Sequence, residues 1–91
     1  MAIYITARHM EGGNRHEHIA RVKWQNTDDS SKTGESSRQE IVDWIRNDKG
    51  TAYVWDGSRA VVVMVVDGTP PYLRTYADGV WTDNLLALPT Y

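Results

Sequence analysis

The chain has 91 residues, of which 41% are hydrophobic and 24% are charged, and its formal net charge is −2. This length is short for two domains, and the composition is that of a folded protein rather than a disordered one. The near balance of charge argues against a surface built to bind nucleic acid. Because the chain has no cysteine, it forms neither a disulfide nor a thiolate metal site.

The sequence favours a cytoplasmic location. The N-terminus lacks the basic and apolar regions of a signal peptide. The longest apolar run, residues 60–66, is much shorter than the roughly twenty residues that cross a bilayer. A chain that reaches stability without disulfides also suits a reducing compartment. We therefore expect a cytoplasmic protein that forms one domain over residues 1–91.

The N-terminal part predicts two strands and a polar loop. Residues 3–7 alternate between apolar and polar, and a turn at residues 11–14 leads to a second strand at residues 16–24, whose even positions should face inward. Residues 26–36 are all polar or glycine, so we expect a flexible loop there. Such a loop is either a tolerated insertion or a lid over a binding site.

A helix is predicted over residues 38–49. Ser37 and Glu40 have the spacing of a capping box, and an apolar stripe follows at helical spacing. Gly50 suits the position just after the helix. Trp44 lies in the apolar stripe and should pack on the sheet.

Three Asp-Gly pairs divide the C-terminal half into short strands, which is typical of a meander. The predicted strands are residues 51–55, 59–66, 72–76 and 80–81. The second of these is almost wholly apolar, so it should be covered on both faces. A short helical turn should follow Thr82 and end at Pro89. The expected fold is α+β: a twisted antiparallel sheet of β-β-α-β-β-β order with one helix on one face.

Several short motifs in residues 72–89 look familiar. They are Tyr72-Leu73-Arg74-Thr75, Ala77-Asp78-Gly79, Thr82-Asp83-Asn84-Leu85-Leu86 and Leu88-Pro89. They resemble the end of a small bacterial and phage family known as domain of unknown function 3892. Weaker similarity at Ile5-Thr6-Ala7, His18-Ile19 and Val42-Asp43-Trp44-Ile45 extends the resemblance over nearly the whole chain. The resemblance implies a compact single domain, and it implies no activity, cofactor or catalytic residue.

Polar residues form the first candidate site. They lie close together around a turn and a helix start: Arg74, Thr75, Asp78, Thr82, Asp83 and Asn84. An arginine beside a helix N-terminus suits an anion such as phosphate. Each residue also has a structural explanation as a turn former, a helix cap or an ion-pair partner.

The aromatic residues give a second candidate. The chain has four tryptophans, five tyrosines and no phenylalanine. Trp24 and Trp44 are readily explained as core residues. Trp55 and Trp81 are not, and they offer faces on which a nucleobase could stack.

Three histidines are a weaker candidate for a metal site. Alternation and a hairpin would bring His9, His16 and His18 near one another. The alternative is that they are partly exposed histidines at one end of the sheet.

These features together predict a non-enzymatic binding module, a homo-oligomer without a cofactor, that captures a small anionic or nucleotide-like ligand. In a phage, such a module would sequester a host defence signal, an inference that rests on the family resemblance. One alternative is a protein-interaction domain that uses an aromatic surface or a sheet edge. Another is a metal-dependent enzyme, although no phosphate-binding glycine loop or hydrolase motif indicates catalysis.

Overall fold

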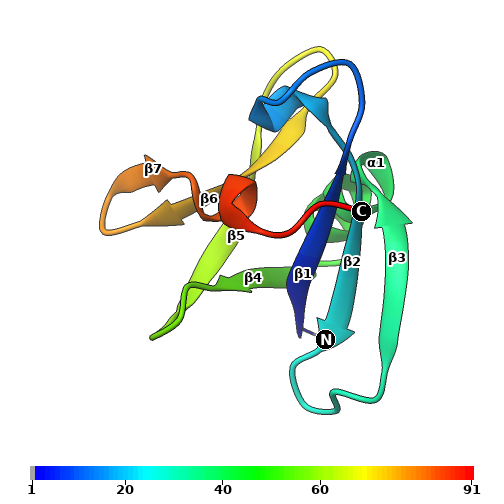
Figure 1. Ribbon diagram of the computed structural model, residues 1–91, viewed down its shortest axis with the longest axis vertical. Coiled ribbons are helices and arrows are strands. Elements are labelled where there is room, and N and C mark those ends of the chain that lie inside the picture. Colours follow the sequence, from blue (N-terminus) through cyan, green and yellow to red (C-terminus); the bar gives the residue numbers. More distant parts are fainter. Residues whose placement is uncertain (1) are drawn as a thin grey trace.

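The computed structural model describes residues 2–91, which form a seven-stranded sheet, one α-helix and two short 3₁₀ turns (Figure 1). The strands are β1 (Ala2–Met10), β2 (Ile19–Asn26), β3 (Thr33–Ser37), β4 (Thr51–Trp55), β5 (Ala60–Val66), β6 (Tyr72–Ala77) and β7 (Val80–Thr82). The helix is α1 (Arg38–Asn47), and the 3₁₀ turns are η1 (His16–His18) and η2 (Asn84–Ala87). The strand order across the sheet is β3-β2-β1-β4-β5-β6-β7. Within residues 2–91, no helix is long and apolar enough to span a membrane.

The sheet is mixed, because β1 and β4 run parallel. Strands β2 and β3 add to one side of β1, and α1 then returns the chain so that β4 pairs on the other side. Residues 2–4 pair with residues 51–53 in the same direction. All other neighbouring strands are antiparallel. The α+β class is therefore confirmed, whereas the predicted fully antiparallel order is wrong.

Part of the predicted loop at residues 26–36 is a strand. Thr33–Ser37 is the edge strand β3, which pairs with residues 21–25 of β2. Its polar side chains hide it from a search for alternating apolar residues, and such side chains are typical of edge strands that avoid unwanted pairing. Gly34 lies against the Trp24 ring, where an added Cβ would be 2.4 Å from a ring carbon. The Trp24 ring of β2 thus supplies an apolar contact that the side chains of β3 do not provide.

The second strand begins later than predicted. Its first three expected residues form η1, and β2 starts at Ile19. The register of β1 against β2 shifts between His9 and Met10, so that Met10 pairs with Ile19. Val22 is fully buried, as predicted for the even-numbered residues, but the odd-numbered Ile19 is fully buried as well. A shift in register changes which side chains face the core.

Helix α1 begins where the capping box predicts. The Ser37 hydroxyl accepts a hydrogen bond from the Glu40 backbone N–H at 3.1 Å, and the Glu40 carboxylate accepts one from the Ser37 N–H at 2.9 Å. The helix ends at Asn47, two residues earlier than expected. Gly50 lies against the ring of Trp44, where an added Cβ would be 2.2 Å from ring carbons. This close approach lets Trp44 pack against the core.

The core lies on one face of the sheet. Its members come from the strands, α1 and η2: Ile3, Ile5, Ile19, Val22, Ile41, Val42, Ala52, Val54, Val63, Leu73 and Leu85. Strand β5 alternates, because Val61 and Val63 are buried while Met64 is exposed. The prediction that this strand is covered on both faces is therefore wrong. The opposite face, which carries Tyr4 and Tyr53, is called the outer face below.

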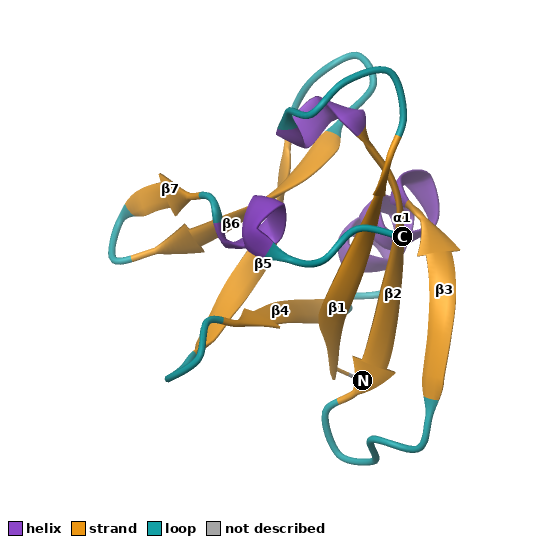
Figure 2. Ribbon diagram, in the orientation of Figure 1, coloured by secondary structure: helices purple, strands orange, loops and turns teal. Residues whose placement is uncertain are grey.

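The turn η2 fills the space between β1 and β6 (Figure 2). Its Leu85 is fully buried. The Arg8 guanidinium donates hydrogen bonds to the carbonyl oxygens of Leu86 at 2.7 Å and Leu88 at 3.1 Å. The Arg8 backbone N–H also donates a hydrogen bond to the Pro89 carbonyl oxygen at 2.9 Å. The predicted C-terminal helical turn is confirmed, and Arg8 ties it to β1 by satisfying carbonyls at its end.

Candidate functional site

A row of paired residues crosses the outer face from one edge of the sheet to the other. Strand register places the following residues side by side: Thr33, Gln25, Tyr4, Tyr53, Val62, Tyr76 and Trp81. The ring centroids of Tyr4 and Tyr53 are 6.1 Å apart, and those of Tyr76 and Trp81 are 5.1 Å apart. Aromatic rings that cluster on an uncovered face are typical of surfaces that bind another molecule.

A hollow of about 440 Å³ opens beside this row, where β1 and β4 separate. The two strands pair only over residues 2–4 and 51–53, so the end of β4 lies free of β1. The hollow is lined by Tyr4, Ile5, Thr6, Gln25, Trp55 and Leu88. The Trp55 side chain is 54% exposed, and its ring meets the Tyr4 ring edge-on at 6.4 Å. One edge of the indole therefore contacts Tyr4, while about half of the Trp55 surface faces solvent.

An irregularity in β1 places Thr6 in the hollow. Ile5 pairs with Trp24 and Ala7 pairs with Lys23, so Thr6 has no partner of its own across β2. The Thr6 hydroxyl donates a hydrogen bond to the carbonyl oxygen of Lys23 at 3.3 Å. Bulges of this kind are common beside binding sites, because the extra residue redirects a side chain.

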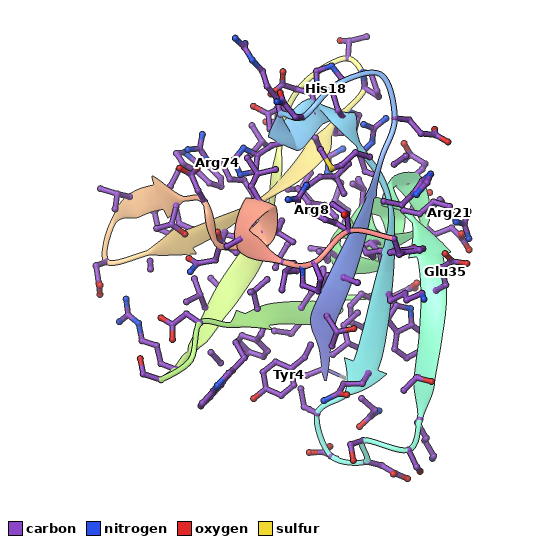
Figure 3. All side chains as sticks on the ribbon, in the orientation of Figure 1. Tyr4, Arg8, His18, Arg21, Glu35 and Arg74 are labelled. Carbon is purple, nitrogen blue, oxygen red and sulfur yellow. The ribbon has the colours of Figure 1, made fainter. Side chains whose placement is uncertain are left out.

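A second hollow of about 520 Å³ continues from the first toward β3. The two hollows share Thr6 and Gln25, and the second adds Lys23 and Glu35. The Lys23 ammonium lies 4.5 Å from the centroid of the Tyr91 ring. Together the hollows form a groove with an aromatic end at Tyr4 and a charged end at β3, both of which can be followed in Figure 3.

The charged end of the groove has two positive side chains, Arg21 and Lys23, and one negative side chain, Glu35. Glu35 faces Arg21 at 3.6 Å. A hydrogen bond from Tyr91 lowers the pKa of the Glu35 carboxyl, while burial and the Glu35 carboxylate raise the pKa of Tyr91 to about 12. Glu35 is therefore ionised and faces Arg21, and Lys23 adds a second positive charge at this end of the groove.

Five of the six residues in the predicted polar cluster lie together where β7 leads into η2. The Thr75 hydroxyl donates to the Thr82 carbonyl oxygen and accepts from the Asn84 N–H, both at 3.1 Å. The Thr82 hydroxyl donates to the side-chain oxygen of Asn84 at 2.7 Å. Arg74 donates to the Thr82 carbonyl oxygen at 3.2 Å and to Asp83 at 3.0 Å. These bonds fasten η2 to β6, so the cluster has a clear structural role.

The other predicted residues lie in different places. Asp78 forms a turn with φ of 54° and pairs with Arg59 at 2.9 Å. Trp81 is at the β7 end of the outer row, against Tyr76. Trp55 alone among the predicted residues lines the hollow beside Tyr4.

The sequence did not indicate that His16 joins the polar cluster. Its side chain is buried, and its Nε2 atom lies 3.7 Å from Asp83 Oδ1. Burial, with a smaller effect from Arg74, lowers the pKa of His16. No sequence signal links His16 to Asp83, because the two residues lie in opposite halves of the chain.

The three histidines do not converge on a metal position. His9 Nδ1 lies within hydrogen-bonding distance of the Tyr91 backbone oxygen, and His18 Nδ1 accepts a hydrogen bond from the Arg15 N–H at 3.2 Å. Over residues 2–91, no three potential ligands among histidine, aspartate and glutamate gather around one point.

These observations define a small α+β domain with an aromatic outer face, a groove across four strands and a hydrogen-bonded cluster at η2. The chain belongs to the family described as protein of unknown function DUF3892, whose sequence pattern matches residues 4–89. The resemblance noted in the sequence is thus confirmed. No curated protein and no solved structure matches the chain.

Proposed function

We propose that the protein is a non-enzymatic binding module that captures a small nucleotide-like ligand in the hollow beside Trp55. The observation that carries this proposal is the half-exposed Trp55 ring, which contacts Tyr4 edge-on at a hollow of about 440 Å³. A hollow of this size suits a small molecule, and an indole face stacks well on a nucleobase. Thr6 and Gln25 supply hydrogen-bonding groups that would orient the base.

The charged end of the groove would take the anionic part of the same ligand. Lys23 lines the hollow that shares Thr6 and Gln25 with the first one. An ammonium group there would attract a phosphate attached to a base that stacks on Trp55. The two ends of the groove therefore fit the two chemical parts of a nucleotide.

The proposal also includes the oligomeric state and the location of the protein. We propose a cytoplasmic homo-oligomer, in which the exposed aromatic residues of the outer row would contact another subunit. In a bacterial or phage protein, a non-enzymatic module of this kind would sequester a nucleotide-like signal.

The test compares adenosine with adenosine monophosphate, each titrated against the protein by isothermal calorimetry. Trp55→Ala should weaken the binding of both ligands by about tenfold or more, because it removes the stacking surface. Lys23→Gln should weaken adenosine monophosphate about two- to fivefold and leave adenosine unchanged, because it removes one exposed charge.

Trp81→Ala is the matched control, since Trp81 is exposed on the outer face but does not line the hollow. It should bind both ligands as the original chain does. If neither ligand binds the original chain, or if the two tryptophan variants lose binding equally, the site at Trp55 is wrong.

A second candidate function is a protein-interaction domain. The hairpin of β6 and β7 projects from the body of the molecule (Figure 1). At its tip, Val80 is 59% exposed and Trp81 is 42% exposed. Exposed apolar residues on a projecting edge favour a protein partner. Native mass spectrometry that returned a stoichiometric complex with a different protein, lost in Trp81→Ala, would support this function over the first, because a complex of identical subunits is expected from both.

A further inference from the structure

The His16 side chain is buried without satisfying its hydrogen-bonding capacity. The side chain is 8% exposed, and its Nε2 atom has no hydrogen-bond partner within the part of the chain that the structure describes. Buried polar atoms usually have a partner, because leaving one unpaired is costly. The unpaired Nε2 atom therefore needs an explanation. One explanation is that a bound ligand supplies the missing hydrogen-bond partner.

The Asp83 carboxylate stands where such a ligand would be. Its Oδ1 atom is 3.0 Å from Arg74 Nη2 and 3.7 Å from His16 Nε2. The contact with Arg74 is a charge-assisted hydrogen bond, whereas the distance to His16 is too long for a hydrogen bond. The Asp83 side chain is also 72% exposed, so it can turn into solvent without disturbing the core. One oxygen thus faces both groups but satisfies only Arg74.

The charges around His16 favour an anion once Asp83 has moved. The groups that face it are Arg74 on β6, Arg8 on β1, Asp83 before η2 and Glu17 on η1. Arg8 is held by the carbonyl oxygens at the end of η2 and needs no carboxylate. Figure 3 shows Arg8 and Arg74 in the same part of the molecule, close to η2. With Asp83 turned away, two arginines and one carboxylate remain.

We propose that His16 and Arg74 form a binding site for a single oxyanion, a carboxylate or a phosphoryl group, which the Asp83 side chain occupies when no ligand is bound. The incoming oxygen displaces the Asp83 carboxylate from Arg74 and accepts a hydrogen bond from His16 Nε2. The site is separate from the hollow beside Trp55 and does not depend on the function proposed for it.

The experiment titrates inorganic phosphate and, separately, acetate, at constant ionic strength set by chloride, and follows ¹H–¹⁵N NMR shifts of residues near Asp83. Asp83→Asn removes the competing charge, so it should bind the preferred anion about tenfold more tightly than the original chain. Arg74→Gln should bind it about tenfold more weakly. The tighter of the two anions identifies the group as phosphoryl or carboxylate.

Arg59→Gln is the matched control for Arg74→Gln, because Arg59 also pairs with an aspartate but lies on the surface. It should leave anion binding unchanged, as should Trp55→Ala. A further readout is the pKa of His16, followed through its ¹³Cε1 signal, which should rise when the anion is added because a bound negative charge stabilises the imidazolium.

The proposal is overturned if Asp83→Asn binds phosphate and acetate no more tightly than the original chain. It is also overturned if Arg59→Gln weakens binding as much as Arg74→Gln does. The Asp83→Asn measurement remains decisive even if Arg74→Gln fails to fold, because Asp83 is exposed and its replacement keeps the shape of the side chain.

Discussion

Burial of the His16 imidazole should make the stability of the protein depend on pH. Loss of hydration, together with the nearby positive charge of Arg74, lowers the pKa of His16 below its ordinary value of 6.5. The unfolded chain therefore takes up a proton at this position more readily than the folded protein does. The free energy of unfolding should consequently decrease as the pH falls from 6.5 toward the lowered pKa, and this loss is absent above 6.5.

His16→Phe tests this expectation, because phenylalanine keeps a buried ring and removes the titrating nitrogen. The free energy of unfolding of both proteins should be measured in urea at several pH values between about 5 and 7.5. We expect the original chain to lose more stability on acidification than the variant does. Parallel stability profiles for the two proteins would show that the acid sensitivity arises at another group.

At the scale of single elements, β3 shows how one strand depends on its neighbour. Its side chains contribute little apolar surface, and it is held by pairing with β2 and by the Trp24 ring. The Trp24 indole N–H donates a hydrogen bond to the Ser36 hydroxyl at 3.1 Å. Gly34 provides the space in which the ring lies. The packing of β3 therefore depends on a close contact between its backbone and the Trp24 ring that only glycine permits.

Gly34→Ala should therefore destabilise the protein by about 1–3 kcal/mol, because the new methyl group would overlap the Trp24 ring. The free energy of unfolding in urea measures this cost. Thr33→Ala, an exposed change in the same strand, should alter stability by no more than about 0.5 kcal/mol. A Gly34→Ala protein as stable as the original would mean that the ring moves aside without cost.

For the whole molecule, η2 completes the core. Leu85 is fully buried, and the turn that carries it is held by Arg8 on β1 and by the threonine network on β6. The first and last parts of the chain are thus joined through one short turn. We expect the sheet to unfold as one cooperative unit with this turn in place.

Leu85→Ala should lower the free energy of unfolding by about 2–5 kcal/mol, because it leaves a cavity between the two halves of the sheet. Val80→Ala serves as the control, since Val80 is exposed at the tip of the β6–β7 hairpin, and it should cost less than about 0.5 kcal/mol. Equal costs in thermal or urea unfolding would show that η2 is peripheral to the core.

The sequence by itself determined the features that depend on neighbouring residues. The α1 capping box needs only Ser37 and Glu40, and the Asp-Gly turns bound strands close to those observed. The grouping of Thr75, Thr82 and Asn84 was also predictable, because a tight hairpin joins them. The family resemblance belongs here too, since its motifs are short runs of adjacent residues.

Only the tertiary structure decided the features that join distant parts of the chain. β3 has no apolar pattern of its own and becomes a strand because β2 offers hydrogen bonds and the Trp24 ring. The parallel pairing of β1 with β4 depends on where α1 returns the chain, and the hollow beside Trp55 exists because those strands separate after three paired residues. His16 meets Asp83 for the same reason: contacts between remote residues are set by packing of the whole sheet, which no local pattern records.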